Sequence, residues 1–187
     1  FASDEWEEVR LDIDENCNPD IIAALPDLSD IETSSYDAIF SSHNIEHLFP
    51  HEVDIALLEF NRVLKDDGYL LITCPDLKSV AKHVAEDKLL DVLYESPAGP
   101  ISALDILYGH RLSLQKGNHY MAHKCGFTRT VLMGLFNNAG FKAVTGAERQ
   151  NLFDLWCIGS KDENAEQKSI EQILRSHLGL VEEVKVF

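Results

Sequence analysis

Apolar residues occur at every second position in short stretches near the start of the chain. In residues 8–14 they alternate with polar residues, a pattern typical of a strand with one buried face. The apolar run at residues 20–25 is too short for a helix, and YDAIFSS at residues 36–42 has strand character. These patterns predict three strands in the amino-terminal part of the chain.

A longer periodic pattern begins at Pro50, a residue that suits the first turn of a helix. Apolar residues then recur every three or four positions through residues 51–64, which predicts a helix packed on a sheet. KDDG at residues 65–68 predicts a turn, and the unbroken apolar run at residues 69–74 predicts a strand buried on both faces. A strand, a helix and a strand in this order predict a right-handed parallel crossover.

The remaining pattern is mixed. Residues 76–126 have irregular helical character interrupted by glycines and prolines, which predicts an insertion over the carboxyl ends of the strands. Residues 130–140 predict a helix that ends at a glycine, and residues 141–146 and 152–160 predict an antiparallel pair. We therefore predict an α/β fold with a Rossmann-like, mostly parallel sheet, helices on both faces and an antiparallel C-terminal strand.

The predicted organisation is one main domain over residues 1–161, with the insertion at residues 76–126, and a C-terminal helical tail over residues 162–187. The tail has a weak amphipathic pattern that carries no functional signal. With 187 residues, of which 45% are hydrophobic, the chain is long enough for one globular core.

Charge and cysteine usage narrow the classes of function. The chain has 16 Lys and Arg against 32 Asp and Glu, a formal net charge of −16, so its surface would repel DNA and RNA. Its apolar runs are too short to span a membrane, and no basic-then-apolar leader is present. The cysteines lie far apart, without zinc-finger spacing. We expect a cytoplasmic protein with reduced thiols and with neither a nucleic-acid nor a membrane partner.

Four stretches, VRLDID, PDL, YDAIFSSHNIEHL and EFNRVLKDDGYLLITCPDL, together resemble the class I S-adenosylmethionine-dependent methyltransferases of the type 11-like branch. The most specific is EFNRVLKDDGYLLI, which is similar to the family's E-x-x-R-V-L-K-P-G-G, with Asp66 and Asp67 in place of Pro-Gly. The resemblance runs from about Glu8 to Lys161. It implies an S-adenosylmethionine cofactor bound across the carboxyl ends of the strands, and the net charge favours a small-molecule or sugar-like methyl acceptor.

The resemblance also assigns roles to residues that match the family's motifs. Asp12 would accept hydrogen bonds from the ribose hydroxyls, with Asp14 as a rival for this role, and Ile13 would lie on the adenine. Asp27 would contact the adenine amino group, and the backbone amide of Leu28 would contact a ring nitrogen. The alternative for Asp27 is an Asx-turn within a loop.

Ser41, Ser42 and His43 follow the strand that, by the resemblance, ends nearest the transferred methyl group. Ser41 and Ser42 would border the cofactor or the acceptor, and His43 is the candidate catalytic base because imidazole titrates near neutral pH. An exposed imidazole without a catalytic role is the alternative. The insertion offers further candidates for a base or an acceptor pocket, although its aromatic residues could equally form its own small core: His110, His119, His123, Tyr94, Tyr108, Tyr120 and Met121.

The glycine-rich turn that follows the first strand in this family is absent from the chain, which starts at Phe1. Its glycines let the backbone approach the methionine part of the cofactor. We expect this strand and turn to precede Phe1, because a sheet without its central strand has an apolar gap and unpaired edges. A catalytically inactive methyltransferase-like binding module is the alternative.

The stretch SSHNIEHLF holds two histidines and a glutamate in the spacing H-x-x-E-H, which one class of zinc peptidase uses. Such a site needs a helix that holds both histidines and a third protein ligand from farther along the chain. Here only two residues separate His47 from Pro50, so the turn is short. We therefore expect no metal site, and we expect Glu46 and His47 to cap and brace the turn.

Overall fold

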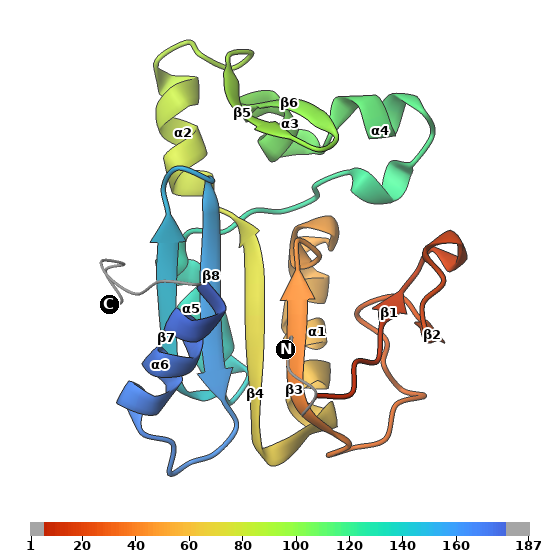
Figure 1. The fold of residues 1–187 in the computed structure, drawn as a ribbon, viewed down its shortest axis with the longest axis vertical. Coiled ribbons are helices and arrows are strands. Elements are labelled where there is room, and N and C mark those ends of the chain that lie inside the picture. The colour runs from red at the N-terminus through yellow and green to blue at the C-terminus, as the bar shows by residue number, and fades with distance from the viewer. Residues whose placement is uncertain (1–5, 179–187) are drawn as a thin grey trace.

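The computed structural model describes residues 6–178 and contains a four-stranded sheet (Figure 1). Its strands lie in the order β3 (Tyr36–Ser42), β4 (Leu64–Pro75), β8 (Asp154–Ser160) and β7 (Lys142–Arg149). β3 and β4 are parallel, whereas β8 is antiparallel to both of its neighbours. Three of the four strands run in the same direction, as expected for the predicted mostly parallel sheet. β8 runs in the opposite direction and lies between β4 and β7, so two of the three strand pairings are antiparallel.

The helix α1 (Pro50–Val63) connects β3 to β4, as the periodic pattern predicted. The Glu52 carboxylate accepts a hydrogen bond from the backbone N–H of Phe49 at 2.7 Å, which satisfies a free donor at the helix start. β4 begins at Leu64, directly after the helix, so the predicted turn at residues 65–68 lies within the strand. A register shift against β3 accommodates these residues.

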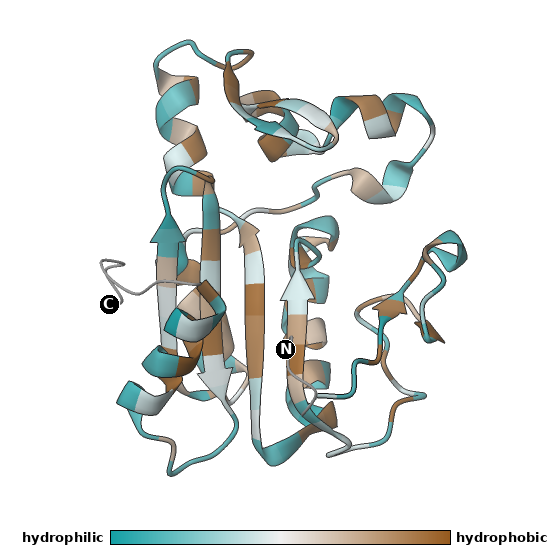
Figure 2. Cartoon of the chain, in the orientation of Figure 1, coloured by the Kyte–Doolittle hydropathy of each residue, from teal (hydrophilic) through white to brown (hydrophobic). Residues whose placement is uncertain are grey.

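Helices cover both faces of the sheet, as predicted. On one face, α1 and α5 (Arg129–Asn138) bury a cluster that includes Leu57 and Phe136. On the other face, α6 (Gln167–Leu178) buries Ile170 in a second cluster. Figure 2 shows apolar residues along the middle of β4 and β8, which both clusters share. The C-terminal helix thus packs on this sheet, and the rest of the predicted tail lies outside the described residues.

The insertion forms a layer beyond the carboxyl ends of β3 and β4 (Figure 1). It contains a β-hairpin where only irregular helix was predicted, and this hairpin packs with α3 around a small core of its own. The mixed polarity of the hairpin strands gave no clear period-2 signal. No helix in residues 6–178 is long and apolar enough to cross a lipid bilayer. The elements of the insertion are α2 (Leu77–Ala85), β5 (Val92–Ser96), β6 (Gly99–Ser102), α3 (Ala103–Tyr108), α4 (Arg111–Gln115) and the 3-10 turn η3 (His119–Met121).

The first two strands are shorter than predicted. β1 (Leu11–Asp12) and β2 (Ile21–Ile22), separated by the 3-10 turn η1 (Glu15–Cys17), pair in parallel with each other and do not join the four-stranded sheet. β3 is consequently at the edge of the larger sheet. Between β1 and β3 lies a pocket of about 410 Å³ with a mostly apolar lining.

Candidate functional site

The pocket between β1 and β3 brings together four of the predicted cofactor residues. Asp12 is the last residue of β1, and Ser41 and Ser42 end β3, so both strands bring their carboxyl ends to the same hollow. Leu28, from the loop after β2, also lines it. Most of the remaining lining is apolar and includes Val9, Leu11, Ile21, Leu25, Ile39 and Phe60.

One carboxylate oxygen of Asp12 makes a hydrogen bond within the turn that follows β1. Its Oδ1 accepts a hydrogen bond from the backbone N–H of Asp14 at 2.8 Å. Within residues 6–178, Oδ2 has no hydrogen-bond partner and can accept one from a ligand hydroxyl. The carboxylate of Asp14, in contrast, caps η1 by accepting hydrogen bonds from Asn16 and does not line the pocket. The geometry therefore favours Asp12 over its rival.

Two predicted residues lie outside the pocket lining. The side chain of Ile13 is exposed to solvent. Asp27 is also exposed, and its Oδ1 accepts a hydrogen bond from the backbone N–H of Ser29 at 3.0 Å, which is the Asx-turn alternative. Hydrogen bonding to Ser29 lowers the pKa of Asp27. Its neighbour Leu28 is buried, and its carbonyl accepts a hydrogen bond from the Arg62 guanidinium at 2.8 Å.

The end of β3 turns sharply at His43. The backbone of this residue has a positive φ of 49°, and its N–H donates to the carbonyl of Thr73 at 2.9 Å. Ser42 Oγ lies 3.2 Å from the Thr73 hydroxyl. Ser41 Oγ is buried and has no hydrogen-bond partner among the described residues, although it lines the pocket. This hydroxyl is available to a ligand in the pocket.

His43 lies outside the pocket lining and beside a buried carboxylate. Its Nδ1 is 3.3 Å from Glu46 Oε1, close enough for an ion pair but without hydrogen-bond geometry. Burial alone would lower the pKa of His43, but the Glu46 carboxylate raises it above its usual value. The imidazole is about half exposed, so it can reach both this carboxylate and solvent.

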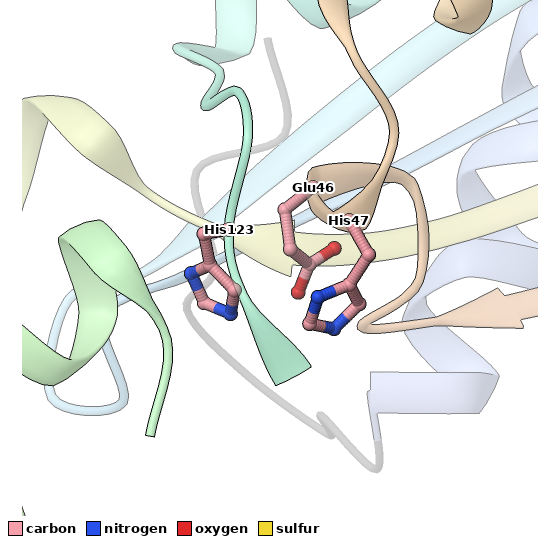
Figure 3. A group of neighbouring side chains, drawn as sticks. All are labelled: Glu46, His47 and His123. Carbon is pink, nitrogen blue, oxygen red and sulfur yellow. The ribbon is translucent and has the colours of Figure 1, made fainter. Parts of the chain in front are cut away.

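Glu46 and His47, in the 3-10 turn η2 (Ile45–His47), meet His123 from the end of the insertion (Figure 3). From the sequence, Glu46 and His47 were predicted to brace the turn, and His123 was a separate candidate for a base. No local sequence pattern predicts contact between residues so far apart in the chain. The H-x-x-E-H spacing was the one signal of a metal site, and the sequence did not identify its third ligand.

Backbone hydrogen bonds hold the two segments of this cluster together. The N–H groups of Lys124 and Cys125 donate to the carbonyl of Glu46 at 2.8 and 3.3 Å. The Cys125 thiol donates to the carbonyl of Ile45 at 3.4 Å. The backbone of η2 therefore braces the turn, with His47 Nδ1 3.1 Å from the Ala122 carbonyl oxygen. The Glu46 carboxylate, which was predicted to cap the turn, makes no hydrogen bond among the described residues.

A second, smaller pocket of about 170 Å³ lies between the carboxyl end of β4 and the insertion, with Tyr108 and His123 in its lining. The other candidates of the insertion are elsewhere. Tyr94 stacks on Phe153 near the insertion's own core, with ring centroids 6.3 Å apart. His110, His119, Tyr120 and Met121 do not line either pocket.

Residues 7–72 match the model of a family described as a methyltransferase domain, which confirms the resemblance drawn from the sequence over this stretch. No curated protein sequence matches the chain significantly.

Solved structures with a similar fold include the PH0226 protein from Pyrococcus horikoshii, with a TM-score of 0.52 and 15% identity over 83% of this chain and 74% of that protein. A SAM-dependent methyltransferase from Archaeoglobus fulgidus has a TM-score of 0.49 and 14% identity, over 80% and 74% of the two chains. A possible histamine N-methyltransferase from Thermotoga maritima has a TM-score of 0.46 and 18% identity, over 74% of this chain. The chain spans 60% of the length of the Thermotoga protein. The Pyrococcus match supports the α/β fold.

Proposed function

We propose that this chain, whose residues 7–72 belong to the methyltransferase domain family, binds S-adenosylmethionine and transfers its methyl group to a small-molecule acceptor. The observation that carries the proposal is the placement of Asp12, Ser41 and Ser42 at the carboxyl ends of β1 and β3, at one end of the apolar pocket between these strands. Open α/β sheets bind ligands in this position.

The pocket residues fit the nucleoside end of the cofactor. Asp12 Oδ2 can accept a hydrogen bond from a ribose hydroxyl, and such bonds to a carboxylate are strong. Ser41 Oγ, buried without a partner among the described residues, would gain one from the ligand. The first glycine of the chain is Gly68, so residues before it offer no glycine cradle for the methionine end. The assignment is therefore restricted to the nucleoside end.

When bound, the cofactor supplies a methyl group already activated on a sulfonium. The protein then has to orient the acceptor and remove its proton. His43 is our candidate for the proton acceptor, since Glu46 lies 3.3 Å from its Nδ1 and stabilises the protonated imidazole. The methyl group would move from sulfur to the acceptor oxygen or nitrogen, while the acceptor proton moves to the imidazole.

The acceptor we propose is small. A net charge of −16 opposes a polyanionic acceptor. The second pocket, about 170 Å³ and next to the insertion, has room for a small group and lies at the carboxyl end of β4.

Calorimetry with S-adenosylhomocysteine, on the natural full-length protein, tests this proposal. We expect binding that Asp12→Ala weakens by about 10- to 150-fold, because hydrogen bonds to a charged group contribute about 1.5–3 kcal/mol. Asp14→Asn is the matched control, since its side chain keeps the cap on η1 and does not line the pocket. A folded protein without affinity for the nucleoside would favour the inactive binding module. Equal losses in both variants would remove Asp12 from the site.

A further inference from the structure

Three side chains with metal-binding atoms converge beside His43. One ligand atom each from Glu46, His47 and His123 lies within 4.8 Å of the other two. Figure 3 shows the Glu46 carboxylate beside the two imidazole rings, which come from different segments of the chain. The ring centroids of the two histidines are 4.9 Å apart.

The Glu46 carboxylate is buried and has few partners: His43 Nδ1 lies 3.3 Å from its Oε1, without hydrogen-bond geometry. The residue is 1% exposed, and neither carboxylate oxygen has a hydrogen bond among the described residues. A buried carboxylate without compensation costs several kcal/mol. The ammonium group of neighbouring Lys124 lies 4.7 Å from the Phe49 ring centroid, in a cation–π contact. Around Glu46 stand three imidazoles and the thiols of Cys74 and Cys125, so a protonated imidazole or a bound cation can offset its charge.

In each histidine, one ring nitrogen is held by a backbone carbonyl. Nδ1 of His47 lies 3.1 Å from the carbonyl oxygen of Ala122, and Nδ1 of His123 lies 2.7 Å from that of Ile106. A carbonyl oxygen only accepts, so each Nδ1 carries the hydrogen, and each neutral ring keeps its lone pair on Nε2. Metal-binding histidines use this same arrangement, in which a backbone carbonyl fixes the tautomer and the ring direction.

We propose that Glu46, His47 and His123 bind a divalent transition-metal cation of the zinc type, through one carboxylate oxygen and the Nε2 atoms of the two imidazoles. Imidazole ligands favour such cations over magnesium and calcium. Three protein ligands leave one tetrahedral position open for water or another oxygen ligand. Bonds of about 2.1 Å place tetrahedral ligands about 3.4 Å apart, so ligand atoms that now lie up to 4.8 Å apart approach each other by at most about 1.4 Å on binding.

This site supplies what the H-x-x-E-H stretch lacked in the sequence. The first histidine of the spacing, His43, stays outside the ligand set, and His123 takes the place of the distant third ligand. A long helix is unnecessary, because the hydrogen bonds from Lys124 and Cys125 to the Glu46 carbonyl fix the two segments relative to each other. Cation binding does not depend on the proposed methyl transfer.

The test is zinc binding by tag-free, chelator-treated protein, measured by calorimetry and by competition with a chromogenic chelator. All variants carry Cys17→Ser, which removes the exposed thiol as a rival ligand. We expect one zinc ion per chain, no response to magnesium, and an increase in Tm with zinc. Bound Co2+ should show the intense visible bands of a four-coordinate site.

Glu46→Gln and His123→Ala should each weaken zinc binding by about 100-fold or more, since loss of a ligand exceeds the 10- to 100-fold effect of an outer partner. His119→Ala is the matched control, because this exposed histidine lies outside the cluster, and it should bind zinc as the parent does. Circular dichroism verifies folding, and Glu46→Gln keeps the side-chain shape. An absence of zinc binding, or binding that both ligand variants retain, would overturn the site. Affinity for S-adenosylhomocysteine, measured on the same proteins, reports separately on the proposed function.

Discussion

Asp105 in α3 holds the insertion together, and its removal should destabilise that layer. The residue is 4% exposed. Its carboxylate accepts hydrogen bonds from the backbone N–H and the hydroxyl of Ser102, at 3.0 and 2.6 Å. It also accepts three from Arg111, from the backbone N–H at 3.1 Å and from the guanidinium at 2.7 and 3.0 Å. One carboxylate therefore joins the end of β6, the start of α3 and the start of α4.

The expected cost of Asp105→Ala is about 3 kcal/mol in the stability of the insertion. Breaking a buried ion pair typically costs about 3–5 kcal/mol, and we take the lower end because water can solvate the half-exposed Arg111 side chain. This cost includes the loss of the acceptor for the buried hydroxyl and N–H of Ser102. Asp91→Asn, a change at an exposed position of the same insertion, should cost less than about 0.5 kcal/mol.

The stability that Asp105 contributes should decrease as the pH falls. Burial alone would raise the pKa of Asp105, but the hydrogen bonds from Arg111 and Ser102 hold it well below its ordinary value of 3.8. Because the folded state binds this proton less tightly than the unfolded state, the carboxylate contributes stability above pH 3.8. This contribution is lost as the pH falls through the folded-state pKa, so the parent and Asp105→Asn should converge in acid.

Hydrogen exchange across residues 99–116, together with urea unfolding, measures this prediction. We expect faster exchange in the Asp105 variants at pH 7, concentrated in α3 and α4, and a smaller difference at low pH. A loss below about 0.5 kcal/mol at pH 7, or a difference that is constant with pH, would refute the reasoning.

Three further changes have defined outcomes. Gly159→Ala should cost about 1–3 kcal/mol in urea unfolding, because its new Cβ would lie 2.8 Å from the Phe136 ring, whereas Gly134→Ala, with open space in helix α5, should be neutral or stabilising. Leu174→Ala should cost about 2–5 kcal/mol by the same measurement, because this side chain fixes α6 to the sheet, and a smaller loss would show that α6 contributes little to the core. His43→Ala should reduce methyl transfer while S-adenosylhomocysteine affinity is retained, and full turnover would exclude it as the base.

The sequence predicted the centre of the fold well. Where apolar residues follow a long, regular period, as in α1 and β4, the burial pattern alone specifies the element. The lengths of β1 and β2 were overestimated. An alternating pattern shows which face of a strand is apolar, but it does not show whether a neighbouring strand is present for pairing. β5 and β6 were missed because their strands are half exposed and pair mainly with each other.

The proposed cofactor site and the proposed cation site also differ in how far the sequence could predict them. Asp12, Ser41 and Ser42 could be predicted to lie near one another because each is at the carboxyl end of a strand, and these ends meet at one edge. His123 follows η3 in the insertion, and no sequence period places it against Glu46. His123 and Glu46 come together because the end of the insertion passes next to η2.

This path couples the structural role of Asp105 to the proposed cation site. The carbonyl that accepts the hydrogen bond of His123 Nδ1 belongs to Ile106, the residue after Asp105 in α3. If Asp105→Asn loosens α3, the tautomer and direction of His123 are less well fixed, and zinc affinity should fall by about 10-fold, within the range of outer-partner effects. Asp91→Asn should leave it unchanged. If Asp105→Asn destabilises α3 but leaves the zinc affinity unchanged, the Ile106 carbonyl does not orient the His123 imidazole.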